Sequence, residues 1–400
     1  MNTHLATPAA LVSIDFGKID FDASLEELSL LAKSAGAVPV VTLTGRRSSP
    51  DAKMYVGSGK VEELKQAVMA NGVEIVIVNH VLSPGQQRNL EQALETRVID
   101  RNSLILDIFA QRAKSHEGKL QVELAQLQYL ATRLVRAWTH LERQKGGIGL
   151  RGPGETQLET DRRLIGERVK MLKSRLEKLR RQHGTQRRQR ERNRAFSVSL
   201  VGYTNAGKST LFNALTKAQA YAADQLFATL DTTSRRIYLG EAGNIVLSDT
   251  VGFIRDLPHQ LVAAFRATLE ETIHADLLLH VVDASSAVRA DQIHQVNGVL
   301  RDIGADGARQ ILVFNKTDAI PELRDRAGTI ERDEYGNISR VFLSAREGLG
   351  LDALRAAIIE AATTPALGPA QSDAGDVRFL DIESEPVSLD ESAHEPTSEF

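Results

Sequence analysis

The stretch Gly202-Tyr203-Thr204-Asn205-Ala206-Gly207-Lys208-Ser209 decides the fold of this 400-residue chain. It follows an apolar run at residues 196–201 that predicts a buried strand, and it precedes residues 210–215, whose apolar side chains share one helical face. A glycine-rich loop between a strand and a helix binds polyphosphate, because its backbone N–H groups and the helix N-terminus point at the anion. We therefore predict a phosphate-binding loop (P-loop), in which Lys208 neutralises the outer phosphates and the Ser209 hydroxyl holds Mg²⁺.

Three further motifs follow this loop, each after an apolar run. Asp249-Thr250-Val251-Gly252 would place Asp249 near Mg²⁺ through water and the Gly252 N–H near the γ-phosphate. In Asn315-Lys316-Thr317-Asp318, the terminal carboxylate would accept from the ring N1–H and the exocyclic amine of guanine, a donor pair that adenine lacks. Leu343-Ser344-Ala345 completes the set, with the Ala345 N–H near the guanine carbonyl. Together the motifs predict a guanine nucleotide site.

A polar-rich loop, Leu226-Phe227-Ala228-Thr229-Leu230-Asp231-Thr232-Thr233, lies between the first two motifs and is typical of segments that order over a bound nucleotide. We predict Thr229 as the second Mg²⁺ ligand and as a γ-phosphate sensor. Thr232 and Thr233 are the alternatives for this role.

Two residues depart from the Ras-type pattern. Phe253 stands where Ras-type proteins carry a water-orienting glutamine, and a phenyl ring cannot orient a nucleophile. We therefore expect an intrinsic rate at or below about 10⁻³ s⁻¹ and a partner that accelerates hydrolysis. Asn205 resembles the asparagine of GTPases that hold K⁺ beside the phosphates in place of an arginine finger, so K⁺ is a second candidate cofactor. The predicted catalytic residues are Lys208, Thr229, Gly252 and Asn205.

Composition and charge exclude several classes of protein. The chain has no cysteine, so disulfides, thiolate metal sites and cysteine nucleophiles are absent. It has no secretory signal and no apolar run near the 18 or so residues that span a bilayer, which predicts a cytoplasmic protein. Residues 167–194 hold twelve Lys or Arg against three Asp or Glu, and residues 364–400 hold one Arg against nine acids. The basic segment predicts RNA contact, with a plain linker as the alternative, and the acidic end predicts a disordered tail.

The region before residue 115 predicts a small α/β domain with a mostly parallel sheet. It alternates apolar runs at 38–43, 73–78 and 98–99 with helical patterns at 25–35, 61–69, 84–94 and 103–113. Gly57-Ser58-Gly59-Lys60 suggests a second phosphate loop, but it lacks the preceding glycine and the hydroxyl after Lys60. We interpret it as a turn before a helix, with ATP binding there as the weaker alternative.

Two long amphipathic patterns follow, at residues 120–141 and 165–179, with apolar side chains spaced alternately by four and three. They predict a helical hairpin whose apolar seams bury each other. The joining loop at 146–157 carries five glycines and a proline, more than a tight connection needs. It either probes an RNA cavity or is only a connector.

The glycine-rich segment at 146–163, the loop at 227–231 and the stretch at 249–258 resemble those of one family, the HflX ribosome-associated GTPases. The resemblance covers about residues 11 to 362. It implies an N-terminal α/β domain, a helical hairpin and a P-loop GTPase domain of doubly wound α/β type. It also implies GTP-dependent binding to the large ribosomal subunit and its rRNA, with the hairpin loop near the peptidyl transferase centre, and a role in ribosome splitting, rescue or biogenesis.

We therefore predict an N-terminal α/β domain at 1–115, the hairpin with its basic linker at 116–194, a P-loop GTPase domain at 195–363 and an acidic disordered tail at 364–400. The leading hypothesis is a Mg²⁺-dependent, ribosome-activated GTPase that acts as a monomer. The alternatives are a nucleotide-gated RNA-binding protein with incidental hydrolysis and an ATP-driven RNA remodeller. The predicted nucleotide and metal contacts are Gly202, Tyr203, Thr204, Asn205, Ala206, Gly207, Lys208, Ser209, Phe227, Ala228, Thr229, Leu230, Asp231, Asp249, Thr250, Val251, Gly252, Asn315, Lys316, Thr317, Asp318, Leu343, Ser344 and Ala345, of which Ser209 and Thr229 are the direct Mg²⁺ ligands.

Overall fold

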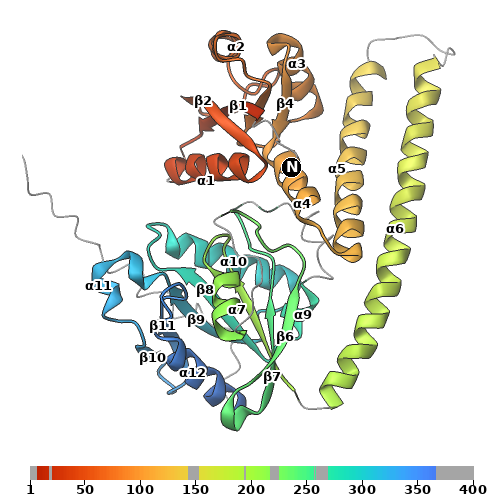
Figure 1. Cartoon of the computed structure of the whole chain (residues 1–400). Coiled ribbons are helices and arrows are strands. Elements are labelled where there is room, and N and C mark those ends of the chain that lie inside the picture. Colours follow the sequence, from red (N-terminus) through yellow and green to blue (C-terminus); the bar gives the residue numbers. More distant parts are fainter. Residues whose placement is uncertain are drawn as a thin grey trace, which may run out of the picture.

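The computed structural model describes residues 7–17, 20–142, 153–192, 195–216, 225–255, 257 and 269–365. Two α/β units lie one above the other, and a long helical hairpin stands beside both of them (Figure 1). The predicted fold class, an N-terminal α/β domain with a hairpin followed by a doubly wound P-loop domain, is confirmed.

The N-terminal unit is a four-stranded parallel sheet in the order β2-β1-β3-β4. Its strands are β1 (Thr7–Asp15), β2 (Ala37–Arg46), β3 (Ile75–Val78) and β4 (Arg97–Asp100). The helices are α1 (Phe21–Ser34), α2 (Ser58–Asn71), α3 (Pro84–Leu94) and α4 (Arg101–Arg112). Buried side chains of α1 and α4 cover one face and those of α2 and α3 cover the other.

The sequence analysis named no strand before residue 38, yet β1 is a central strand of this sheet. Its small residues and Ser13 weaken the apolar signal, although Ser13 is as buried as its neighbours. The stretch at 57–60, predicted as a turn before a helix, instead forms the start of α2: Gly57 is the N-cap, and residues 58–60 lie in the helix. Lys60 pairs with Glu63 in the first turn of this helix, 2.8 Å away, so the lysine has a structural partner.

The second unit is a seven-stranded sheet in the order β10-β11-β9-β8-β5-β7-β6. The strands are β5 (Phe196–Gly202), β6 (Thr233–Tyr238), β7 (Asn244–Asp249), β8 (Leu277–Asp283), β9 (Arg309–Asn315), β10 (Ile330–Arg332) and β11 (Ile338–Phe342). The five inner strands are parallel, and β6 and β10 add antiparallel edges. The sequence analysis missed both edge strands, because their polar residues carry no apolar run.

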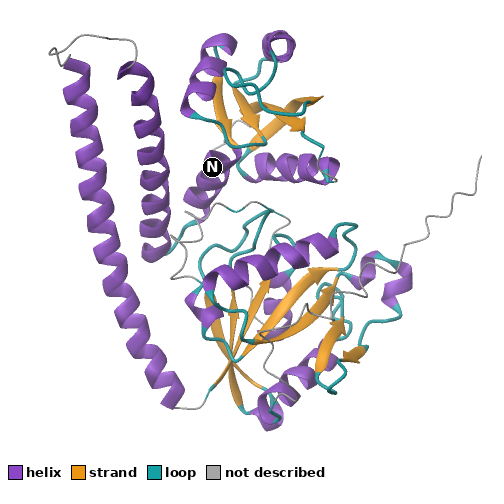
Figure 2. Cartoon of the chain, turned by 180° about the vertical axis from the view of Figure 1, so that it is seen from behind, coloured by secondary structure: helices purple, strands orange, loops and turns teal. Residues whose placement is uncertain are grey.

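Helices cover both faces of this second sheet (Figure 2). Apolar side chains of α7 (Lys208–Thr216) and α12 (Leu351–Thr363) pack on one face, and those of α10 (Arg289–Ile303) pack on the other. Shorter elements are α9 (Glu270–Ile273), α11 (Pro321–Arg324) and the 3-10 turns η1 (Gly240–Ala242) and η2 (Thr317–Ala319). This is the doubly wound arrangement, in which ligands bind beyond the carboxyl ends of the strands.

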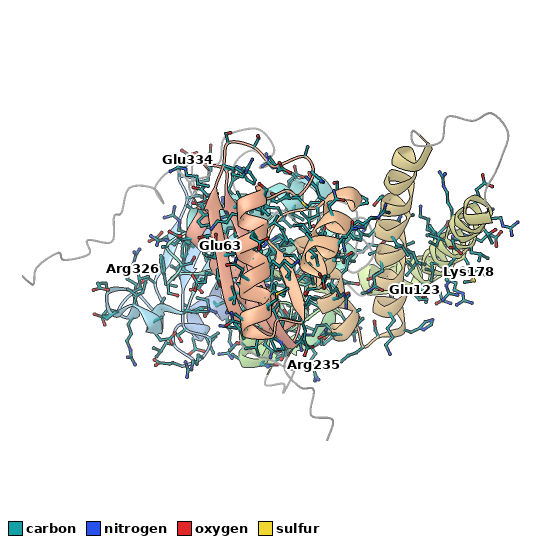
Figure 3. All side chains as sticks on the ribbon, turned by 90° about the horizontal axis from the view of Figure 1, so that it is seen from above. Glu63, Glu123, Lys178, Arg235, Arg326 and Glu334 are labelled. Atoms are coloured by element: carbon teal, nitrogen blue, oxygen red, sulfur yellow. The ribbon has the colours of Figure 1, made fainter. Side chains whose placement is uncertain are left out.

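The hairpin consists of α5 (His116–Glu142) and α6 (Pro153–Arg192). Leu120, Leu124 and Leu172 are buried between the two helices, so their apolar stripes pack against each other as predicted. Viewed from above, α5, which carries Glu123, lies between the domains and α6, which carries Lys178 (Figure 3). In the part of the chain that the structure describes, no helix is long and apolar enough to cross a membrane.

Two predicted features lie outside the described residues. Residues 146–152 of the glycine-rich loop are not described, and of residues 153–157 only the helical backbone is. The acidic segment is described only at 364 and 365.

Candidate nucleotide-binding site

The P-loop connects β5 to α7 at the carboxyl edge of the second sheet. Gly202 has a φ of +145°, and a Cβ there would lie 2.2 Å from the Val281 carbonyl oxygen of the adjacent strand, so only glycine fits. The Lys208 side chain is buried, and its Nζ donates to the carbonyl oxygens of Gly202 and Tyr203 at 3.1 and 2.8 Å. Burial lowers the pKa of Lys208 to about 8, and the charge of Asp249 opposes this shift. The ammonium group thus lies against the backbone of the P-loop.

Three oxygen-bearing side chains meet at the start of α7. The Ser209 hydroxyl lies 2.6 Å from the Thr229 hydroxyl and donates to Asp249 Oδ2 at 2.7 Å, while the Thr229 hydroxyl donates to the same oxygen at 3.0 Å. Burial raises the pKa of Asp249, and the hydrogen bond from Ser209 and the charge of Lys208 oppose this. Thr229 therefore reaches both predicted metal-site residues, whereas Thr233 begins strand β6.

These oxygen donors fit a hard divalent cation such as Mg²⁺. Asp249 Oδ1 is buried and has no hydrogen-bond partner among the described residues, so it is available to a metal-bound water. No group of three or more His, Cys, Asp or Glu side chains that could hold a metal ion occurs in the described ranges. A cation here would complete its coordination with water and phosphate oxygens.

A cavity of about 50 Å³ lies beside these side chains. Besides predicted site residues it is lined by Thr210 and Gln225, which the sequence analysis missed; Thr210 directly follows Ser209, and Gln225 lies just before the predicted loop. The remaining lining residues are Thr204, Asn205, Gly207, Lys208, Ser209, Phe227, Ala228, Thr229, Thr250 and Gly252.

Gly252 packs directly against the P-loop. A Cβ at this position would lie 2.8 Å from Thr204 Cγ2 and 2.9 Å from Thr204 Cα, so a side chain here would clash with the P-loop backbone. The next residue, Phe253, pairs with the P-loop backbone: its N–H donates to the Gly202 carbonyl at 3.1 Å, and its carbonyl accepts from Thr204 N–H at 2.7 Å. The Phe253 side chain is 1% exposed and belongs to the apolar core that the two α/β units share.

The base-recognition motif is tied to the P-loop by one side chain. Asn315 Nδ2 donates to the Ala206 carbonyl at 2.9 Å, and its Oδ1 accepts from the Ala345 N–H at 2.9 Å. The Ala345 N–H, predicted to lie near the guanine carbonyl, thus donates to Asn315. Leu343 and Ser344 are fully buried beside this contact.

The last two residues of this motif carry buried oxygens without partners in the described part of the chain. These are Thr317 Oγ1 and Asp318 Oδ1. Lys316 has a φ of +65° and pairs with Asp283 at 2.7 Å. Because an unpaired buried carboxylate oxygen is costly, its presence indicates a place for N–H donors of a ligand.

Three predicted contact residues direct their side chains away from the cavity. The Tyr203 hydroxyl donates to Glu27 Oε1 at 2.6 Å and accepts from the Arg255 N–H at 2.8 Å. Leu230 is buried in the shared core, and Asp231 bonds the chain just before α5. Their side chains link the nucleotide site to the N-terminal unit.

A buried ion pair extends this link. Arg101, at the start of α4, pairs with Glu27 of α1 at 2.9 Å and donates to the Arg255 carbonyl at 3.3 Å. Arg255 in turn pairs with Asp20 at 3.2 Å. The sequence analysis missed this network, because its members come from separate segments and form no local motif.

Known proteins that are similar to this chain include GTP-binding proteins. Three family models match the chain: "GTP-binding GTPase N-terminal" at residues 22–110, "GTP-binding GTPase Middle Region" at 112–190 and "50S ribosome-binding GTPase" at 197–316. A solved GTP-binding protein from the archaeon Sulfolobus solfataricus, in complex with GDP, is 25% identical over 89% of this chain and 99% of that chain, with a TM-score of 0.46.

Two curated relatives are much closer in sequence. The GTPase HflX of Escherichia coli strain K12 is 56% identical over 88% of this chain and 82% of that protein. The GTPase HflX of Magnetococcus marinus is 51% identical over 82% of this chain and 76% of that protein. With this identity over most of both chains, and with the family resemblance that the sequence predicted, the chain belongs to the HflX family of GTPases and is a GTP hydrolase.

Proposed function

We propose that this GTPase binds the large ribosomal subunit through its helical hairpin and that contact with the subunit accelerates GTP hydrolysis. It would act as a monomer in the cytoplasm, in ribosome splitting, rescue or biogenesis. One observation carries the proposal: Phe253 is buried in the core between the two α/β units, at the position from which a glutamine would orient the attacking water. Because no glutamine stands at this position, slow intrinsic hydrolysis is expected until a partner completes the site.

The hairpin supplies the surface for such a partner. Most side chains of α6 between residues 159 and 182 are exposed, and Lys and Arg predominate over the segment 167–194. Arg168 bridges to Glu123 of α5 at 2.6 Å, and Arg181 pairs with Glu177, so part of this charge is neutralised within the hairpin. The remaining cations suit the phosphate backbone of rRNA. The matched family description, "50S ribosome-binding GTPase", supports the same partner.

Within the site, we assign each side chain the role that its position supports. The Lys208 ammonium would exchange its hydrogen bonds to the loop carbonyls for contacts with the outer phosphates. The negative charge of the phosphates would offset the cost of burying the ammonium. Ser209 and Thr229 would bind Mg²⁺ directly and Asp249 through water; the bound ion would neutralise charge on the phosphates. The Gly252 N–H would contact the γ-phosphate, and Asp318 would read guanine.

Asn205 is the proposed K⁺ ligand. It lines the cavity in the left-handed backbone region, with a φ of +61°. The amide oxygen of asparagine is a hard ligand of the kind that suits an alkali cation. Hydrolysis should therefore be faster in KCl than in NaCl at equal ionic strength, with large subunits present and without them. Equal rates in the two salts would exclude a catalytic K⁺.

The proposal is tested by GTP turnover of the full chain with and without large subunits. We expect a rate of about 10⁻³ s⁻¹ or less alone and a large increase with large subunits, but not with small subunits. Replacing residues 146–157 by a short Gly-Ser linker should abolish the increase and leave the basal rate unchanged. Equal turnover with and without large subunits would refute the proposal.

A further inference from the structure

The segment Gln225–Asp231, here called the switch segment, is held from two sides. On the nucleotide side, the Thr229 hydroxyl contacts Ser209 and Asp249. On the opposite side, described residues of the N-terminal unit and of the base of the hairpin bond Leu226 and Asp231 and pack against Phe227. The nucleotide site and the hairpin therefore share one short piece of chain.

Asp231 is the strongest of the outer anchors. Its Oδ2 accepts from the backbone N–H groups of Lys114 and Ser115 at 2.9 and 2.8 Å, and its Oδ1 accepts from the Ser115 hydroxyl at 2.5 Å. These residues immediately precede α5, which begins at His116. Three hydrogen bonds to one carboxylate are charge-assisted and hold the base of the hairpin tightly.

The contact continues into the first turn of α5. The Ser115 hydroxyl, while donating to Asp231, accepts from the Gly118 N–H at 2.8 Å and so satisfies one of the open N–H groups of the helix. A Cβ at Gly118 would lie 2.2 Å from Asp231 Oδ1, so the carboxylate sits directly against the helix backbone. Asp231 thus contacts the helix itself and not a flexible linker.

Apolar anchors hold the rest of the switch segment to the same unit. The Phe227 ring packs edge-on against Phe109 of α4, with ring centroids 4.6 Å apart, and the Leu226 N–H donates to the Ser34 hydroxyl at 3.0 Å. Leu226, Phe227 and Leu230 are all buried in the shared core. A movement of the N-terminal unit or the hairpin base is therefore transmitted to Thr229, two residues before Asp231.

We propose that Asp231 is a positioning residue that couples the nucleotide to the hairpin. A nucleotide with a γ-phosphate, by binding Thr229, would set the angle of the hairpin through Asp231. Docking of the hairpin on RNA would in turn change the position of Thr229 and hence the rate of hydrolysis. Binding linkage requires the coupling to act in both directions. The second half of this proposal rests on the proposed function, since it requires a ribosomal partner; the first half does not.

The length of the hairpin makes the coupling measurable. Helix α5 has 27 residues, so it is about 40 Å long at about 1.5 Å per residue. A rotation of about 5° at its base would therefore move its far end by about 3.5 Å. The chain has no cysteine, so two introduced cysteines can carry a fluorophore pair at chosen positions.

The experiment is nucleotide-dependent energy transfer in the full chain. Leu164→Cys on α6 and Tyr238→Cys on β6 provide two exposed labelling positions, 53% and 72% exposed. We expect transfer efficiency to differ between GDP and a non-hydrolysable GTP analogue with Mg²⁺, and we expect Asp231→Ala to abolish the difference. Asp51→Ala is the matched control, because the Asp51 carboxylate also accepts two backbone N–H groups but lies in a loop of the N-terminal unit.

Two further measurements separate coupling from a merely structural role. Asp231→Asn, a milder change, should reduce the nucleotide-dependent difference while GDP affinity stays at the wild-type value. Stimulation of turnover by large subunits should fall about tenfold in Asp231→Ala. If wild-type efficiency is the same in both nucleotides, or if both Asp231 variants keep the wild-type difference, the inference is wrong. If large subunits never stimulate turnover but the difference depends on Asp231, the proposed function fails while the coupling stands.

Discussion

Replacing Asp318 by asparagine should exchange guanine for xanthine as the preferred base. Asp318 lies in η2, directly after β9, and its Oδ1 is buried without a partner among the described residues. In the proposed role, the two carboxylate oxygens accept from the N1–H and the amine of guanine. An asparagine keeps one acceptor but turns an N–H₂ group towards the guanine amine, where donor faces donor.

The size of the effect follows from these hydrogen bonds. One charge-assisted bond, worth about 1.5–3 kcal/mol, is lost, and the remaining bond loses its charge. A total of about 2–4 kcal/mol corresponds to about 30- to 700-fold weaker GDP binding. Xanthine carries a carbonyl in place of the amine, so it accepts from the new N–H₂ group and should recover most of the lost affinity.

The assay is equilibrium titration of the full chain with fluorescent GDP and XDP in the presence of Mg²⁺. Asp325→Asn is the matched control, since it removes the same charge from an exposed position seven residues away. We expect the control to bind both nucleotides as the wild type does. Unchanged GDP affinity in Asp318→Asn, or an equal loss for GDP and XDP in a folded protein, would refute the assignment of Asp318 as the guanine reader.

Three further predictions concern stability and rate. Burial lowers the pKa of His280 to about 3 from 6.5. Below pH 6.5 the unfolded chain therefore binds a proton at this histidine that the folded chain does not bind. The free energy of unfolding should fall as the pH drops through this range, by about 2 kcal/mol at pH 5. His280→Gln should therefore flatten the fall of Tm between pH 7 and 5, and an unchanged slope would contradict this. Tyr203→Phe removes the hydroxyl that bonds Glu27 and the Arg255 N–H, and should cost about 1–3 kcal/mol of stability; a calorimetric Tm equal to that of the wild type would exclude such a contribution. Thr229→Ala should lower kcat about 10- to 100-fold, equivalent to about 1.4–2.8 kcal/mol, with GDP affinity nearly unchanged, and single-turnover hydrolysis at the wild-type rate would count against Thr229 as a ligand.

Much of the fold could be predicted because its helices and inner strands carry periodic or continuous apolar patterns. The α3 helix begins at Pro84 and ends at Leu94, the limits that the pattern predicted. Strand β1 escaped prediction because burial on both faces of a parallel sheet does not require large side chains at every position. Strands β6 and β10 escaped because they lie at sheet edges, where polar residues are tolerated.

The residues expected to bind the nucleotide could be predicted from the sequence alone. Each motif is a short contiguous stretch that follows an apolar strand. Parallel strands in a doubly wound sheet bring their carboxyl ends to one edge. The order of the motifs along the chain is therefore enough to predict the P-loop, the oxygens of the metal site and the carboxylate expected to bind guanine. Only the tertiary structure decided where Tyr203, Asp231 and Phe253 point. Tyr203 is hydrogen-bonded to Glu27, and Asp231 is hydrogen-bonded to Ser115; the partners of each pair are more than a hundred residues apart in the sequence. No local pattern records such contacts, because they depend on how the N-terminal unit and the hairpin base pack against the nucleotide site.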